Sequence, residues 1–105
     1  MFGFLKNIFG ENQRADLAAL IQEGAYLVDV RSPQEFASGT VKGAVNIPLD
    51  KLQSQLKKCE GKNHIIVFCR SGARSGQAKS ILERNGLTNV TNGGPWQNVN
   101  QFINR

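Results

Sequence analysis

Short apolar runs alternate with amphipathic stretches along the chain, and this pattern predicts strands that alternate with helices. The run Tyr26-Leu-Val-Asp-Val30 is typical of a buried strand, and so is the run His64-Ile-Ile-Val-Phe68. Residues 43–48 predict a brief strand that ends at its proline, and residues 89–92 predict a last short strand. Each of these predicted strands is separated from the next by a helical segment.

The intervening helices are predicted from their caps and from apolar side chains at helical spacing. A first helix over residues 14–23 ends at Gly24, and the segment Ser32-Pro33-Gln34-Glu35 has the sequence of a capping box that begins a short helix. Asp50 is expected to cap a third helix, and a fourth ends near Gly86. The last helix follows a Gly-Gly turn and contains Trp96, Val99, Phe102 and Ile103.

Strands that alternate with helices through short connections indicate an α/β fold with right-handed crossovers. We expect a central parallel sheet of four to five strands with helices on both faces. The length of 105 residues, of which 40% are hydrophobic and 20% are charged, suits one domain over residues 11–105. Residues 1–10 are apolar but are broken by Lys6 and Asn7, so they predict neither a secretory signal nor a membrane span. The role of this segment stays open.

Charge and cysteine content narrow the class of partner. The formal net charge of +5 and the pI near 9.6 favour anionic partners. The basic residues are scattered and are not interleaved with aromatic side chains, so nucleic-acid binding is not expected. Two cysteines, Cys59 and Cys69, are too few for a disulfide scaffold and suit a reducing compartment, so we expect a cytoplasmic protein. A monomer is expected, although the pattern does not determine the oligomeric state.

The stretch Cys69-Arg-Ser-Gly-Ala-Arg-Ser75 joins a predicted strand to a predicted helix and carries the candidate chemistry. A loop of this kind directs several backbone N–H groups, and the positive end of the following helix, into one small space that favours an anion. If Cys69 lies at its base, the field favours the thiolate, and the space above the sulfur favours an anionic reaction partner. We therefore expect covalent sulfur chemistry at Cys69.

Five ordered motifs run through most of the chain. They are Leu27-Val-Asp-Val-Arg31, Glu35-Phe36, Gly43-Ala-Val-Asn-Ile-Pro48, Ile66-Val-Phe-Cys-Arg-Ser-Gly-Ala-Arg-Ser75 and Gly93-Gly94. In this order they resemble the rhodanese family, specifically its single-domain sulfurtransferases, over roughly residues 14–103. Two positions depart from the family pattern. Gly39-Thr40 stands where many members have Gly-His, and only Pro95 separates the glycine pair from Trp96.

The resemblance implies that Cys69 takes a sulfane sulfur from a small anionic donor such as thiosulfate and holds it as a persulfide. An acceptor, which is cyanide, a thiol or another protein, then removes the sulfur, and no metal or organic cofactor is required. Asp29 and Arg31 are expected to form an ion pair at the rim that braces the cysteine loop rather than contacts the substrate. The substrate would be bound by Arg70, Ser71, Gly72, Ala73, Arg74 and Ser75.

Two other functions remain open. A persulfide carrier or an interaction module in a protein sulfur relay would use the same loop. A cysteine phosphatase also binds an anion over a cysteine and clamps it with an arginine. Phosphatases place five residues between the two, whereas four separate Cys69 from Arg74, and the shorter loop favours a sulfur atom over a phosphate ester.

Three further residues of chemical interest are assigned structural roles. The capping box explains Glu35. His64 begins a strand at the end opposite Cys69, where we expect an exposed side chain with no catalytic duty. Cys59 would have to reach across a five-residue strand of roughly 16 Å to act as a resolving thiol, so a structural or solvent-edge cysteine is expected.

Overall fold

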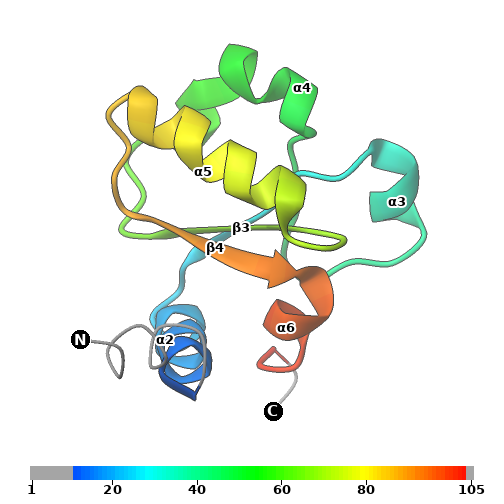
Figure 1. Ribbon diagram of the computed structural model, residues 1–105, viewed down its shortest axis with the longest axis vertical. Coiled ribbons are helices and arrows are strands. Elements are labelled where there is room, and N and C mark those ends of the chain that lie inside the picture. Colours follow the sequence, from blue (N-terminus) through cyan, green and yellow to red (C-terminus); the bar gives the residue numbers. More distant parts are fainter. Residues whose placement is uncertain (1–10, 104–105) are drawn as a thin grey trace.

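Parallel strands form a sheet in the computed structural model, which describes residues 11–103 (Figure 1). The strands are β1 (Tyr26–Asp29), β2 (Val45–Asn46), β3 (Ile65–Cys69) and β4 (Val90–Pro95). Their order is β2-β1-β3-β4, so the crossovers place β1 and β3 in the middle of the sheet. The prediction of a central parallel sheet is confirmed, with four strands.

Helices cover both faces of this sheet, as the crossover connections require. One face is covered by α2 (Glu11–Gln22) and α6 (Trp96–Asn100), which lie below the sheet in Figure 1. The opposite face is covered by α4 (Leu49–Leu52), the 3-10 helix η1 (Gln53–Cys59) and α5 (Ala73–Arg84). The short helix α3 (Pro33–Ala37) follows β1 and lies to one side. The α/β prediction with helices on both faces is thereby confirmed.

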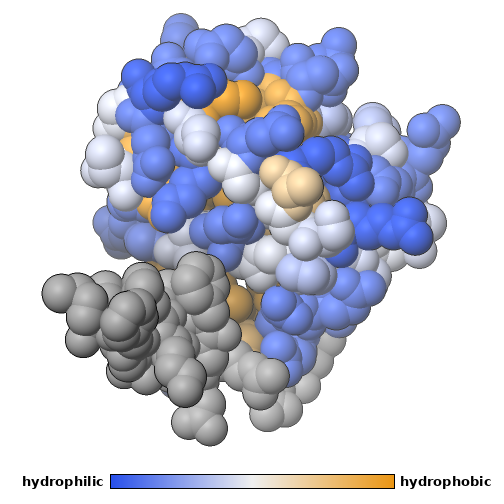
Figure 2. All heavy atoms as spheres, viewed as in Figure 1, coloured by the Kyte–Doolittle hydropathy of each residue, from blue (hydrophilic) through white to orange (hydrophobic). Residues whose placement is uncertain are grey.

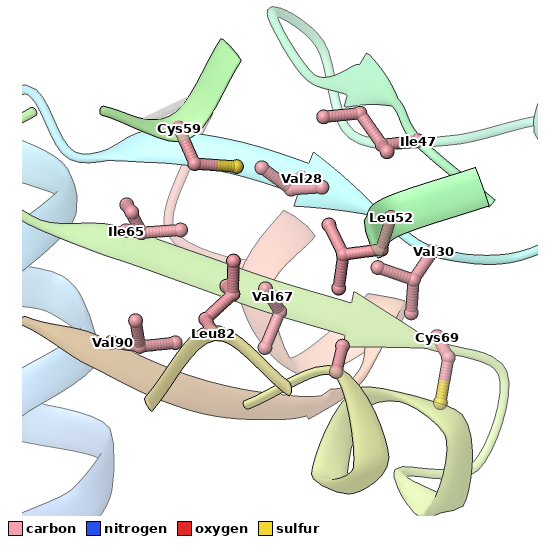
Figure 3. Packing of buried hydrophobic residues seen from close by; sticks show 11 residues of the cluster. Val28, Val30, Ile47, Leu52, Cys59, Ile65, Val67, Cys69, Leu82 and Val90 are labelled. Carbon is pink, nitrogen blue, oxygen red and sulfur yellow. The ribbon is translucent and has the colours of Figure 1, made fainter. Parts of the chain in front are cut away.

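The central strand β3 is apolar on both sides because it lies between two hydrophobic clusters. Ile65, Val67 and Cys69 belong to the cluster beneath α4 and α5, whereas Ile66 and Phe68 belong to the cluster with α2 and α6. All five side chains are fully buried. Figure 3 shows the first cluster, which follows β3 as far as Cys69.

The helix after β2 differs from its prediction. Pro48, and not Asp50, is the N-cap, and no side chain caps this end. The helix begins at Leu49, whose backbone N–H donates to Val30 O at 3.1 Å, so Asp50 already lies inside the first turn. After Leu52 the chain tightens into η1.

Figure 2 shows a largely hydrophilic surface with apolar side chains gathered over α4 and α5.

The predicted Gly-Gly turn is wrong, because both glycines lie inside β4. Val67 pairs with Asn92 and Phe68 with Gly94, so Gly93 is the extra residue of a β-bulge. A Cβ on Gly93 would lie 2.7 Å from Val99 Cγ2, so any larger residue would force its neighbours to move. Pairing with β3 therefore carries β4 on to Pro95, and the helix that follows is short.

Candidate active site

Cys69 is the last residue of β3, and its side chain is fully buried. Figure 3 shows it at one end of the hydrophobic cluster, with Cys59 at the other end. The carboxyl end of a central parallel strand is where open α/β sheets bind their ligands. Cys69 thus lies at the edge of the sheet where such folds bind ligands, with the start of α5 directly after its loop.

Hydrogen-bond donors from the following loop and helix surround the sulfur. The backbone N–H of Gly72 lies 3.0 Å from Cys69 Sγ, and the backbone N–H of Ser75 lies 3.3 Å from it. The Ser75 hydroxyl is also at 3.3 Å. Gly72 has a φ of +106° and stands just before α5, a left-handed conformation that favours glycine and turns the chain back over the sulfur.

These donors determine the ionisation of the thiol. Burial by itself would raise the pKa of Cys69, because it disfavours the thiolate. The hydrogen bonds from the Ser75 hydroxyl and from the backbone N–H groups of Ser75, Gly72 and Ser71 together outweigh burial. The pKa of Cys69 is therefore lowered, which makes its sulfur a better nucleophile near neutral pH.

The other loop residues lie around this buried centre. Arg70, Ser71 and Ala73 are exposed, while Arg74 is half-buried in the first turn of α5. Within residues 11–103, Arg70 makes no hydrogen bond or ion pair. The Arg70 guanidinium is therefore available to a ligand. Arg70 directly follows Cys69 in the chain.

Arg74 is held by Glu35, a link that sequence reasoning missed. The Arg74 Nη1 and Nη2 atoms lie 2.7 Å and 3.0 Å from the two carboxylate oxygens of Glu35. Glu35 also completes the predicted capping box, because its Oε1 accepts the Ser32 N–H at 3.0 Å. The hydrogen bonds from Arg74 first, and then from Ser32, lower the pKa of Glu35 to about 2. Glu35 therefore joins α3 to the cysteine loop.

Asp29 and Arg31 form the expected ion pair, with 2.7 Å between Arg31 Nη2 and Asp29 Oδ2, and both residues are buried. Their remaining hydrogen bonds lead away from the cysteine loop. Arg31 Nη2 donates to Gly39 O at 2.6 Å, and the Thr40 hydroxyl donates to Asp29 Oδ2 at 2.7 Å. The Arg31 guanidinium also lies 5.2 Å from the ring centre of Trp96. The pair thus holds the segment after α3 and does not touch the loop it was expected to brace.

Asn92 is a second residue that sequence reasoning missed. Its Oδ1 lies 2.6 Å from the Ser75 hydroxyl oxygen, which in turn contacts the sulfur. The same Oδ1 accepts the Gly94 N–H at 2.9 Å. No motif marks Asn92, because the bulge in β4 is what brings its amide and the Gly94 N–H together.

His64 and Cys59 both lie outside the cysteine loop, and the expected exposure of His64 is wrong. His64 is half-buried rather than exposed, because its Nε2 lies 2.8 Å from the Thr91 hydroxyl on β4. Cys59 is 1% exposed and packs in the hydrophobic cluster. Burial raises the pKa of Cys59, the opposite of the shift at Cys69. The thiolate is therefore disfavoured at Cys59 and favoured at Cys69.

A cleft of about 460 Å³ opens beside Arg74 on the side of α3 and α4. The cleft is lined by Val30, Ser32, Pro33, Pro48, Leu49, Asp50, Lys51 and Arg74.

No group of three His, Cys, Asp or Glu side chains within residues 11–103 is arranged to hold a metal ion. In the same part of the chain, no helix is long and apolar enough to cross a membrane.

Comparison with known proteins places these features in a wider group. Residues 13–94 match the family model of the rhodanese-like domain. The chain is 38% identical over 74 residues to the thiosulfate sulfurtransferase PspE of Escherichia coli, which covers 69% of this chain and 71% of that protein. It is 36% identical over 93 residues to the human thiosulfate:glutathione sulfurtransferase, covering 73% of this chain and 80% of the relative.

The fold has solved counterparts as well. A structure described as a rhodanese with anions from Escherichia coli is similar with a TM-score of 0.66 at 34% identity, and the match covers 71% of this chain and 91% of that one. Some curated relatives are considerably longer than the matched region. The chain spans 54% of the length of one and 56% of the length of another.

Proposed function

The chain belongs to the rhodanese family, and from this membership we propose that it is a sulfurtransferase that carries a sulfane sulfur on Cys69. Relatives named as thiosulfate sulfurtransferases support sulfurtransferase chemistry in general. The observation that carries the proposal is the set of donors from Gly72 and Ser75 directed at one buried sulfur. Such a site favours a thiolate and, above it, an anionic donor such as thiosulfate.

The first half-reaction loads the sulfur. The Cys69 thiolate attacks the outer sulfur of thiosulfate, a new S–S bond forms, and the S–S bond within thiosulfate breaks. Its electron pair leaves with sulfite. The persulfide that remains on Cys69 carries one negative charge, so charge and atoms balance without a proton, a metal or an oxidant. Because the thiol pKa is already lowered, no separate general base is needed.

The second half-reaction empties the site. A nucleophilic acceptor, cyanide or a thiolate, attacks the outer sulfur of the persulfide. The S–S bond breaks, and its electron pair returns to Cys69 as the thiolate. The products are thiocyanate or an acceptor persulfide, and the enzyme is regenerated in a ping-pong sequence. A protein thiol would serve as an acceptor by the same chemistry, as in a sulfur relay.

Binding of the donor depends on positive charge at the mouth of the loop. Arg70 is exposed and unpaired within residues 11–103, so it is the residue that we assign to the sulfite end of the donor. Arg74 is occupied by Glu35 and contributes its charge at longer range. The Gly72 and Ser75 N–H groups face the sulfur itself.

The test is to mix the protein with thiosulfate and to measure the intact mass. We expect one added sulfur atom, which cyanide removes with release of thiocyanate. The Cys69→Ser variant should gain none, while Cys59→Ser, the matched cysteine control, should load as the parent protein does. The absence of an adduct, or an adduct that survives Cys69→Ser, contradicts the proposal.

Two alternatives give different results in the same experiment. A persulfide carrier would gain sulfur from thiosulfate slowly or only from a protein donor, yet would still load at Cys69. A cysteine phosphatase would hydrolyse an aryl phosphate without gaining sulfur. The Arg74–Glu35 pair disfavours the phosphatase, because it occupies both terminal nitrogens of the arginine that would clamp phosphate.

A further inference from the structure

A chain of hydrogen bonds links Cys69 to the neighbouring strand β4 through one hydroxyl group. Ser75 is fully buried, and its Oγ lies within reach of three acceptors. These are Asn92 Oδ1 at 2.6 Å, Gly72 O at 3.1 Å and Cys69 Sγ at 3.3 Å. A hydroxyl has only one hydrogen to donate, so the three acceptors cannot all receive it at once.

The orientation of the Asn92 amide is fixed by its neighbours. The Gly94 N–H can only donate, so the atom 2.9 Å from it must be the oxygen Oδ1. The other end of the amide, Nδ2, donates to Gly72 O at 3.4 Å. In the short contact with Asn92, Ser75 must therefore be the donor. The Cys69 S–H can meanwhile donate to the Ser75 oxygen, which leaves every group in the thiol form satisfied.

Ionisation of Cys69 changes this arrangement, because a thiolate can only accept. We propose that Asn92 is a positioning residue for the sulfur chemistry, since its Oδ1 and the Cys69 sulfur compete for the single hydroxyl proton of Ser75. A hydrogen bond to a charged acceptor is the stronger one, so the hydroxyl turns to the thiolate when it forms. Asn92 Oδ1 then keeps the Gly94 N–H as its partner.

The competition has a use in the reaction, and this step rests on the proposed function. In the first half-reaction the charge on Cys69 Sγ passes to sulfite, and the inner sulfur of the persulfide no longer needs the hydroxyl. Ser75 can return to Asn92. In the second half-reaction the charge comes back to Sγ as the leaving group, and the hydroxyl is available again. The Ser75 hydroxyl thus donates to Cys69 Sγ when this sulfur is charged and to Asn92 Oδ1 when it is not.

Other charged groups around the sulfur are the same in every Asn92 variant. Arg70 directly follows Cys69, Arg74 lies in the first turn of α5, and Glu35 reaches Arg74 from α3. The Asp29–Arg31 pair lies at the carboxyl end of the neighbouring strand β1, of which Asp29 is the last residue. A change in the titration of Cys69 on substitution of Asn92 by alanine, which adds no charge, therefore reports on the hydroxyl rather than on a rearranged ion pair.

The experiment measures the rate at which iodoacetamide alkylates Cys69 as a function of pH, with the site followed by peptide mass. Asn92→Ala removes the competing oxygen, so we expect the midpoint to fall by roughly half a pH unit to one unit, which raises the rate below the midpoint roughly threefold to tenfold. In a Ser75→Ala background, the same substitution should leave the midpoint unchanged. Merely loosened packing would displace the backbone donors and raise the midpoint, which would overturn the proposal.

Two further variants keep the test decisive. Asn89→Ala is the matched control, because the Asn89 side-chain amide also donates hydrogen bonds, to Lys62 O and Asn63 O. Asn89 precedes β4, at the end of the strand away from Cys69. Its midpoint should not move. If Asn92→Ala does not fold, Asn92→Asp keeps the shape and the acceptor oxygen. Its midpoint should rise more with Ser75 present than in the Ser75→Ala background, and an equal rise in both overturns the proposal.

No sulfur donor is needed for this titration. A shifted midpoint without any sulfur adduct would uphold the role of Asn92 and reject the proposed function, and an adduct with an unmoved midpoint would do the reverse.

Discussion

Glu35 and Arg74 lie 39 positions apart in the sequence and form a bidentate ion pair, with N···O distances of 2.7 Å and 3.0 Å. Glu35 belongs to α3 and Arg74 to the first turn of α5, so the pair links a short helix to the helix that follows the Cys69 loop. Arg74 immediately precedes Ser75, which contacts Cys69 Sγ. The pair therefore links α3 to the turn of α5 that contacts the Cys69 sulfur.

The stability of the protein should depend on Glu35 at acid pH. The folded-state pKa of Glu35 is about 2 against an ordinary value of 4.5, so its contribution to the free energy of unfolding is complete above about pH 4.5 and is lost as the pH falls toward 2. We expect Glu35→Gln, which can still form the capping box, to cost up to about 1 kcal/mol at pH 7. Urea denaturation at several pH values would show a smaller loss below pH 4.5 in the variant than in the parent.

Glu83→Gln is the control for this prediction, because Glu83 faces Lys79 at 4.0 Å on the exposed side of α5. It should leave the acid profile as it is. A Glu35→Gln protein with the same acid profile as the parent would show that the ion pair contributes nothing to stability.

Arg70 and Arg74 should differ in their effect on the donor. Arg70 is unpaired within residues 11–103, so Arg70→Gln should raise the KM for thiosulfate roughly tenfold in a cyanide assay, as expected for the loss of one charge-assisted hydrogen bond. Arg74→Gln should mainly lower stability. Arg84→Gln makes the same charge change at the far end of α5 and should do neither. A larger KM effect at Arg74 than at Arg70 would reverse the assignment.

Much of the fold could be predicted because its signals are local. The apolar run of β3 and the capping box of α3 are each read from a few neighbouring residues. Strand alternation then required a parallel sheet, which placed Cys69 at a carboxyl end. The Gly93-Gly94 pair was misjudged because glycines mark turns and bulges alike. Only the pairing of β4 with β3 shows that this pair forms a bulge.

The polar links within the site could not be predicted in the same way. Glu35 already had a complete explanation as a capping residue, and its second partner lies in a helix that reaches it only after folding. Asn92 has no motif, and its contact with Ser75 depends on the bulge beside it. Arg31 was expected to brace the cysteine loop, but the path of residues 38–40 brings Gly39 O within its reach instead.

Two glycines on neighbouring elements should respond oppositely to substitution by alanine. In Gly93→Ala the new Cβ would lie 2.7 Å from Val99 Cγ2 and 3.0 Å from Ile66 Cγ2, so we expect a loss of about 1–3 kcal/mol from overpacking. In Gly76→Ala the nearest atom is Asn92 Nδ2 at 3.5 Å, an ordinary contact. Within α5, alanine should then stabilise by about 0.5–1 kcal/mol. Thermal unfolding of both variants would test the tight packing of Gly93 in the bulge. A Gly93→Ala protein as stable as the parent would contradict this packing.

Cys59 and Cys69 should react at very different rates although both are buried. Burial raises the pKa of Cys59, whereas at Cys69 the donors from Ser75 and Gly72 outweigh burial and lower it. At pH 7 the thiolate fraction is therefore greater at Cys69, and iodoacetamide should label it alone until denaturant is added. Peptide mass would identify the labelled site.

Because the side chains of Cys59 and Cys69 lie at opposite ends of one hydrophobic cluster (Figure 3), mild peroxide should not join them in an intramolecular disulfide. Equal labelling of the native protein, or such a disulfide, would mean that Cys59 is not the inert core residue its packing indicates.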